Sequence, residues 1–191
     1  MKNPRVIAFL LGSSLFSFLL NSASAGETTW FGQKAAGQWF VGAKVSNVQN
    51  GQSGFDGDAG NAGIILGYEF AKAIAYRGKS SIELDITTSF DDGSFRPNIG
   101  PSGDWDVDTV GVFFAYRTPG TVYFKGKLGL LSSDVEVDVG PANNDQSDTS
   151  FAFGAGLGLL LGERGNLELE VTGDSGDNDL TIISLGGFVR F

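Results

Sequence analysis

The chain has 191 residues, no cysteine, no histidine and a formal net charge of −9 at pH 7. The absence of histidine excludes a histidine-based catalytic triad and the usual zinc sites, and the absence of cysteine excludes a disulfide framework. The excess of acidic over basic residues argues against nucleic-acid binding, because phosphate recognition requires positive charge.

The first 25 residues have the pattern of an export signal. Lys2 and Arg5 form a positively charged start, followed by an apolar stretch that is short for a membrane-spanning helix. An A-x-A cleavage site ends at Ala25. We therefore expect residues 1–25 to be removed as a signal peptide and residues 26–191 to form one domain.

The rest of the chain alternates apolar with polar or small residues in segments of about ten, separated by turn residues. No segment shows sustained helical periodicity. The segments predict eight strands, over residues 38–46, 61–70, 80–90, 107–117, 121–131, 149–161, 166–172 and 180–191. Single-chain bacterial barrels have an even number of strands, and a closed barrel pairs every backbone group within a membrane. The predicted fold is an all-β, eight-stranded antiparallel up-and-down transmembrane β-barrel.

The connections between these strands alternate in length. Those after the second, fourth and sixth strands are mostly short, at residues 71–79, 118–120 and 162–165. The others are mostly longer and rich in Gly and Asp, at residues 47–60, 91–106, 132–148 and 173–179. Outer-membrane barrels have short turns on the periplasmic rim and long loops outside the cell, so the pattern predicts both the orientation and the compartment.

The two faces of the strands differ in charge. One face is apolar throughout, and the other carries five basic and five acidic residues: Lys44, Glu69, Glu83, Asp85, Arg117, Lys125, Lys127, Glu168, Glu170 and Arg190. If the apolar face meets lipid, these charges fill a narrow lumen and must neutralise each other there. The small residues Ala152, Gly154, Gly156 and Gly158 provide room for them, so we expect the lysines at 125 and 127 to meet the glutamates at 168 and 170 across these positions. The alternative is a soluble periplasmic barrel with the apolar face inside, around an apolar ligand.

The long connections and their strand margins hold 15 of the 22 acidic residues and a single base, Arg96. Near the margins of two strands, the alternation predicts that the apolar residues face inward, namely Trp105, Val107, Val135 and Val137. The acids between and beside them are predicted to face outward. This inversion predicts a hairpin that rises out of the bilayer into water, up to about 20 Å beyond the rim.

The acids of this hairpin allow two interpretations. One is a solvated acidic face that keeps the surface soluble. The other is a Ca²⁺ or Mg²⁺ ion held by carboxylates from both strands, with Asp104, Asp106, Asp134 and Glu136 as candidate ligands.

The end of the chain carries the most specific pattern. Ile183, Leu185, Val189 and the final Phe191 share one face of the last strand. Together with the export signal and the alternating turn lengths, this ending resembles the small eight-stranded Gram-negative outer-membrane β-barrels of the OmpA-barrel and OmpX type, often described as porin-like. The resemblance implies a place in the cell outer membrane, contact with lipid and lipopolysaccharide, and recognition of the four residues by the barrel assembly machinery.

The resemblance also bears on function. Enzymes of this size in the family rely on His paired with Ser or Asp, so we expect no enzymatic activity and no cofactor other than a cation at the acidic loops. The resemblance implies surface interaction, adhesion to a host or cell-surface ligand, or a structural role in the outer membrane. The alternative is a small porin-like ion channel, with a lumen gated by Lys125, Lys127, Glu168 and Glu170.

Overall fold

The computed structural model describes residues 29–30, 33–34, 37–70, 78–96, 102–139, 142–176 and 179–191. The predicted signal peptide and its cleavage site lie outside these residues. The chain divides into two compact units, Met1–Ala36 and Gly37–Phe191. In the first unit, strand β1 (Thr29–Trp30) pairs antiparallel with strand β2 (Gln33–Lys34).

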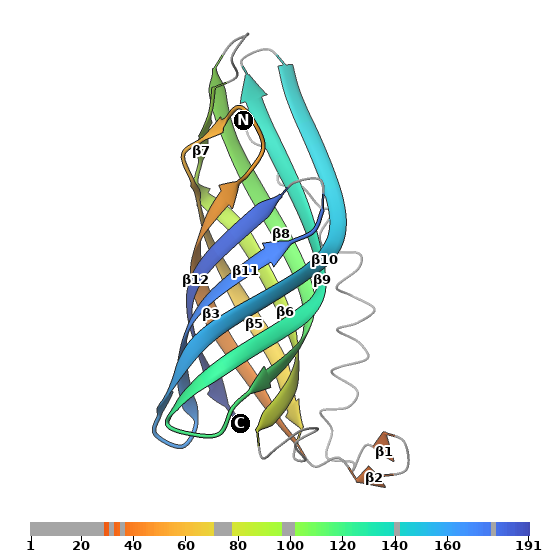
Figure 1. The fold of residues 1–191 in the computed structure, drawn as a ribbon, viewed down its shortest axis with the longest axis vertical. Coiled ribbons are helices and arrows are strands. Elements are labelled where there is room, and N and C mark those ends of the chain that lie inside the picture. Colours follow the sequence, from red (N-terminus) through yellow and green to blue (C-terminus); the bar gives the residue numbers. More distant parts are fainter. Residues whose placement is uncertain are drawn as a thin grey trace. The chain divides into compact units, whose positions relative to one another are not determined.

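The second unit is a closed antiparallel barrel of eight strands, as the sequence predicts (Figure 1). The strands are β3 (Gly37–Asn50), β5 (Ala59–Phe70), β6 (Lys79–Asp91), β8 (Gly103–Arg117), β9 (Val122–Val139), β10 (Ala142–Leu161), β11 (Gly165–Asp174) and β12 (Leu180–Arg190). Each strand pairs with the next along the chain, and β12 pairs with β3 to close the ring. The described residues contain no helix that is long and apolar enough to cross a membrane.

Two short strands extend the sheet at the long-loop rim. Strand β4 (Phe55–Asp56) pairs with β7 (Gly93–Phe95), and β7 pairs in turn with the start of β8. At the opposite rim the turns between β8 and β9 and between β10 and β11 are tight. Gly120 and Gly162 lie there with positive backbone φ angles of 136° and 71°, which glycine adopts without the steric penalty of a side chain.

The predicted strand positions hold, but the connection predicted at 132–148 is wrong. Residues 132–139 continue β9 and residues 142–148 begin β10, and the two segments pair with each other. Strand β8 likewise begins at Gly103, four residues before its predicted start. A strand that crosses a bilayer needs about 9–11 residues, so β9 with 18 residues and β10 with 20 extend well beyond one. We call residues 103–109, 132–139 and 142–150 the protruding sheet.

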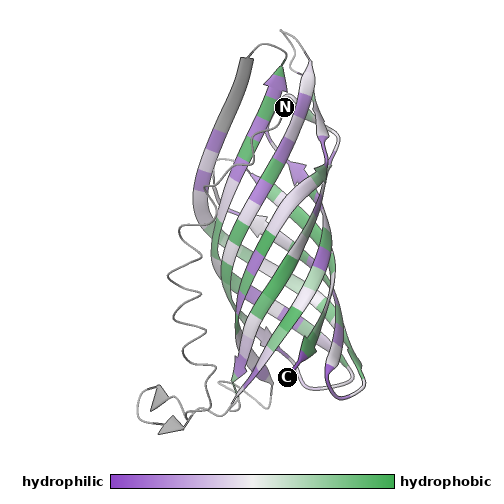
Figure 2. Ribbon diagram, turned by 180° about the vertical axis from the view of Figure 1, so that it is seen from behind, coloured by the Kyte–Doolittle hydropathy of each residue, from purple (hydrophilic) through white to green (hydrophobic). Residues whose placement is uncertain are grey.

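The apolar face points outward from the barrel. Leu128, Phe151 and Phe191 have 61%, 71% and 72% of their surface exposed, and apolar residues on the other barrel strands are exposed in the same way. Figure 2 shows apolar residues alternating with polar ones along the strands. The soluble barrel with an apolar interior is therefore contradicted. An apolar surface of this extent matches a hydrocarbon environment.

The interior changes character along the barrel axis. Towards the short-turn rim it contains charged and polar side chains. Towards the long-loop rim it contains a cluster of buried apolar residues, which we call the apolar cap: Val48, Ala59, Trp105, Val107, Phe113, Leu131, Val135, Ala152, Leu180 and Ile182.

Candidate functional site

All ten charged residues that the sequence places in the lumen are buried, each with 9% or less of its surface exposed. They come from β3, β5, β6, β8, β9, β11 and β12, so the barrel brings together residues far apart in the sequence. Every one of them lies within 4 Å of an opposite charge. Burial of a charge without such a partner would be costly.

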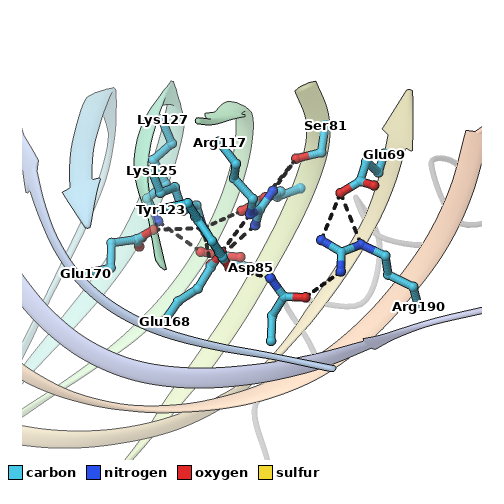
Figure 3. A network of polar contacts seen from close by, with 12 residues as sticks. Glu69, Ser81, Asp85, Arg117, Tyr123, Lys125, Lys127, Glu168, Glu170 and Arg190 are labelled. Carbon is cyan, nitrogen blue, oxygen red and sulfur yellow. Dashed lines mark hydrogen bonds and ion pairs between the residues drawn. The ribbon is translucent and has the colours of Figure 1, made fainter. Parts of the chain in front are cut away.

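Eight of these residues form one connected group, the lumen network, and Figure 3 labels six of them: Asp85, Arg117, Lys125, Lys127, Glu168 and Glu170. Its members are Lys44, Glu83, Asp85, Arg117, Lys125, Lys127, Glu168 and Glu170. Four are basic and four acidic, so the network is electrically neutral. Strands β9 and β11 supply half of it through two residues each, because side chains two apart on a strand share a face.

Glu83 and Lys125 are central to the network. Glu83 has none of its surface exposed and lies 2.6 Å from Arg117 Nη2 and 2.8 Å from Lys125 Nζ. Lys125 Nζ also lies 3.0 Å from Glu168 and 2.8 Å from Glu170. Each group therefore has several opposite charges close by, and loss of either would leave more than one partner uncompensated.

Asp85 connects the far end of the network. Its Oδ2 accepts hydrogen bonds from Lys44 Nζ at 2.7 Å and from Lys127 Nζ at 3.1 Å. Lys127 Nζ lies 2.5 Å from Glu170 Oε1, which completes the path back to Lys125. The lysine is also 4.0 Å from the centre of the Phe113 ring, a cation–π contact with the apolar cap.

A second group lies near the short-turn rim. Glu69 accepts hydrogen bonds from Arg190 at 3.0 and 3.1 Å, and from Lys79 at 2.8 Å. The Lys79 side chain is half exposed, so this pair faces solvent. Asn166 hydrogen-bonds both Arg190 and the Tyr123 hydroxyl, and Tyr123 donates to Glu168 at 2.7 Å. Neutral side chains thus join the second group to the lumen network.

Five polar residues that hydrogen-bond these charges were absent from the sequence-based set: Lys79, Ser81, Tyr123, Asn166 and Thr172. Ser81 links two of the predicted residues, since its hydroxyl donates to Glu83 and accepts from Arg117. Strand parity could have identified Ser81, Tyr123 and Asn166, because each lies two residues before a predicted inward charge. Restricting the prediction to charged side chains left these three out.

Glycines of β10 make room for the network, as the sequence predicts. Gly156 lies between Lys125 and Glu170 in the strand register. At Gly158 a β-carbon would stand only 2.1 Å from the ring of Tyr123. A larger residue at Gly158 would therefore displace the tyrosine that hydrogen-bonds Glu168.

Two small cavities flank the contact between Lys44 and Asp85. Each has a volume of about 10 Å³, at the lower limit for one water molecule. Asp85 borders both cavities, and its Oδ1 has no hydrogen-bond donor among the described residues. Each of these two spaces is therefore large enough for about one water molecule.

The acidic residues of the protruding sheet lie opposite each other. Asp104 pairs in register with Asp138, Asp106 with Glu136, and Asp108 with Asp134. The apolar residues between them point inward, and Trp105 and Val107 are almost completely buried in the apolar cap. This is the inversion that the sequence predicts.

The candidate cation ligands lie on two neighbouring strands. Asp106 and Glu136 are register partners, whereas Asp104 pairs with Asp138 and Asp134 with Asp108. Within the described ranges, no group of three or more acidic side chains is arranged to hold a metal ion. A Ca²⁺ or Mg²⁺ ion at these residues stays a prediction.

The four residues predicted as the assembly signal lie on the outer face of β12. Ile183, Leu185, Val189 and Phe191 have 39%, 47%, 53% and 72% of their surface exposed. The backbone N–H of Phe191 donates to the carbonyl of Trp39 at 3.0 Å, next to the closing pair of strands. Their recognition by the assembly machinery stays a prediction.

Comparison with solved structures finds the same fold at low sequence identity. The attachment invasion locus protein Ail of Yersinia pestis, in complex with the heparin analogue sucrose octasulfate, is 18% identical, with 81% of this chain and 97% of that chain covered and a TM-score of 0.52. Neisserial surface protein A is 14% identical, with 83% and 100% covered and a TM-score of 0.53. The outer membrane protein OprG of Pseudomonas aeruginosa is 12% identical, with 82% and 97% covered and a TM-score of 0.55.

No curated protein matches the chain at a significant level. The model of the family described as "Outer membrane protein beta-barrel domain" matches residues 12–186. This match spans most of the sequence and agrees with the lipid-matched outer face, the closed ring of eight strands and the short turns on one rim. The chain therefore belongs to the outer-membrane β-barrel domain family, whose members reside in the cell outer membrane.

Proposed function

We propose that this protein is a surface interaction protein of the outer membrane, in which a closed barrel holds an acidic protruding sheet outside the cell. The observation that carries the proposal is the filled interior. The lumen network, the group around Glu69 and Arg190, the apolar cap and a second buried cluster of Phe40, Ile65 and Phe188 all fill the interior. An eight-stranded barrel is only wide enough to hold its own side chains, so the interior offers no path for general diffusion.

The exposed end of the barrel is then the part available for function. Long extracellular loops are where outer-membrane barrels carry their specificity. We propose adhesion to a host or cell-surface ligand as the activity and outer-membrane structure as the accompanying role. No reaction is proposed, because the sequence contains no histidine and no nucleophile–base pair can be named.

The charge of the exposed end restricts the ligand. Ail was solved with sucrose octasulfate, a heparin analogue. In this chain the long connections and strand margins contain 15 acidic residues and one base, which would repel a polyanion. We therefore propose a ligand of different chemistry, which is neutral or basic.

The remaining partners follow from the membrane location. We propose that the outward apolar residues contact outer-membrane lipid and lipopolysaccharide, and that Ile183, Leu185, Val189 and Phe191 are recognised by the barrel assembly machinery. Replacement of Phe191 by Ser would then slow assembly into membranes that contain that machinery, while the folded barrel would keep its stability.

Single-channel conductance of the refolded protein in a planar bilayer tests the closed barrel. Insertion is verified by the gel mobility of unheated and boiled samples, because a folded barrel migrates anomalously until it is boiled. A silent bilayer with verified insertion supports the surface function. Discrete current steps that change when Lys125 or Glu168 is neutralised would replace it with a channel.

A small ion channel is the second candidate, and the two cavities beside Asp85 favour it. Separation of Lys44 from Asp85 would join the cavities, and rearrangement of Lys125, Lys127, Glu168 and Glu170 would extend the passage. Every such movement breaks a buried ion pair, which makes a conducting state rare. Conductance would therefore take the form of brief openings that become more frequent in Lys44→Met.

A further inference from the structure

Strand β10 has an open edge in the protruding sheet. It pairs with β9 along residues 142–159, but its pairing with β11 begins only at Ala152. Among the described residues, no strand pairs with the other side of residues 142–151. Figure 1 shows β9 and β10 rising as a long hairpin at the long-loop rim.

The backbone groups that point towards this edge can be identified. The carbonyl of Phe151 accepts hydrogen bonds from the Ser175 N–H at 2.8 Å and the Ser175 hydroxyl at 3.0 Å. The N–H of Thr149 donates to the Asp148 carboxylate at 2.8 Å rather than to β9. In an antiparallel strand the backbone groups of alternate residues point to the same side. Ser147 and Asp145 therefore present both N–H and C=O to the open edge.

The edge lacks several of the usual protections against strand addition. Natural proteins protect exposed edges with charged side chains, especially lysine, with proline or with a β-bulge. The charged residues of this segment are Asp145 and Asp148, which repel an acidic strand but not a basic one. Residues 142–151 contain no proline, lysine or arginine, and their register with β9 runs without a bulge. Gln146, Ser147 and Thr149 are exposed to solvent. The edge is therefore an accessible template for an extended segment.

The charge next to this edge identifies the occupant. Ser147 pairs in register with Asp134, and Asp145 with Glu136. A strand added to β10 would lie about 4.8 Å from it and about 9.6 Å from the acidic residues of β9, within reach of a lysine or arginine side chain. A second copy of this chain would bring its own acids to the same place, and like charges across a sheet are destabilising.

We propose that the open edge of β10 binds an extended basic segment of another protein by strand addition. The inference rests on the proposed surface function and specifies its partner. Backbone hydrogen bonds from Asp145 and Ser147 hold the segment, and the acidic residues of β9 select lysine and arginine on it. The interaction requires no movement of the lumen network.

The test uses the refolded full chain in lipid nanodiscs and a fluorescent peptide that alternates lysine with threonine. Two control peptides separate the contribution of charge from that of backbone hydrogen bonding. One has its lysines replaced by glutamate, and the other has methyl groups on alternate backbone nitrogens, which prevents pairing along one edge. We expect saturable binding of the lysine peptide alone, weakened as NaCl rises from about 50 mM to about 500 mM.

Ser147→Pro is the decisive variant, and Ser147→Ala its matched control. Proline is tolerated on an edge strand where the N–H faces solvent, so the barrel should fold, as anomalous gel mobility will verify. Its ring removes one donor and obstructs the edge, which should weaken peptide binding about tenfold or more. Ser147→Ala keeps the backbone N–H and should bind as the unaltered protein does.

Three outcomes would overturn the inference. Equal binding of the methylated peptide, or of Ser147→Pro, would mean that charge attraction alone acts. Absence of binding by the lysine peptide would mean that the edge accepts no basic strand. Self-association that Ser147→Pro abolishes would identify a second copy as the occupant. None of these outcomes changes the bilayer conductance, so failure of the inference is distinguishable from failure of the closed-barrel function.

Discussion

The lumen and the protruding sheet use the same alternation of charged and apolar residues with opposite orientation. In the lumen, Glu83 and Lys125 point inward and their apolar neighbours point outward. In the protruding sheet, Trp105 and Val107 point inward and Asp104 and Asp108 are exposed. Both segments belong to continuous strands, so the medium around the barrel decides which set faces out. Lipid selects apolar residues and water selects charged ones.

The two regions also differ in how charge is balanced. The lumen network holds four basic and four acidic residues at distances of 2.5 to 3.1 Å, away from solvent. The protruding sheet places acid opposite acid, where water and salt screen the repulsion. Removal of one charged side chain should therefore lower the free energy of unfolding strongly in the lumen network and raise it slightly in the protruding sheet.

The largest expected effect is that of Glu83→Ala. It leaves Arg117 and Lys125 with excess buried positive charge, which should lower the free energy of unfolding by about 3–5 kcal/mol. Urea unfolding in detergent, followed by gel mobility, measures it. The control is Asp104→Ala on the exposed face of the protruding sheet, which should lie within about 0.5 kcal/mol of the unaltered protein. Equal losses in the two variants would remove the distinction between the regions.

A double-mutant cycle should show coupling of opposite sign in the two regions. Lys44→Met with Asp85→Leu keeps the network neutral, so the double variant should be more stable than the sum of the single losses predicts, by about 1–3 kcal/mol. The corresponding cycle for Asp108→Asn with Asp134→Asn should give a repulsive coupling that disappears in high salt. An attractive coupling between the two aspartates would contradict the acid-opposed register.

The space between Gly158 and Tyr123 is too small for a larger side chain at position 158. Gly158→Leu forces the Tyr123 ring from its place beside Glu168, and such overpacking should lower stability by about 1–3 kcal/mol. Tyr123→Ala in the same chain should restore part of the loss, and unfolding in urea measures both. The control is Gly126→Leu, because Gly126 is exposed and no atom lies within 4 Å of its missing β-carbon. Failure of Tyr123→Ala to rescue would mean that Gly158 matters for another reason.

The smallest expected effect is a stabilisation. Asp134→Asn removes one carboxylate from a position opposite Asp108, and relief of this repulsion should raise the free energy of unfolding by about 0.2–1 kcal/mol at low salt. The gain should vanish in about 1 M NaCl. A loss of stability at either salt concentration would show that Asp134 has a structural role that outweighs the repulsion.

The sequence predicted the barrel because the bilayer imposes a strict alternation on every strand. A single period-two rule was enough to place Lys44, Glu83 and Asp85 in the lumen and Phe151 on the outside. It also located the inversion at Trp105 and Val107. These predictions concern which side of a strand a residue faces, and that property follows from the alternation in the local sequence together with the medium around the strand.

The sequence predicted that the lysines of β9 meet the glutamates of β11 across the glycines of β10, and the ion pairs of Lys125 and Lys127 with Glu170 confirm it. It did not predict the other charge pairs. Arg117 and Glu168 are 51 residues apart, and their contact depends on the stagger of four strands. The protruding continuation of β8 and β9 was predicted, but that of β10 was missed, because Asn, Asp and Ser at residues 143–148 are turn formers by composition. Inward Val135 and the apolar cap that surrounds it stabilise strands there in spite of that composition.

The pairing of β12 with β3 has a consequence for assembly. Arg190 and Glu69 are 121 residues apart, and their hydrogen bonds join β12 to β5 across β3, the strand that β12 pairs with to close the ring. The loss of chain entropy on closing so long a loop delays this step relative to the adjacent hairpins. Until then β3 and β12 each expose an edge that another chain can occupy. The hydrogen bonds between Arg190 and Glu69 therefore form only after β12 has paired with β3, and they then stabilise the closed barrel.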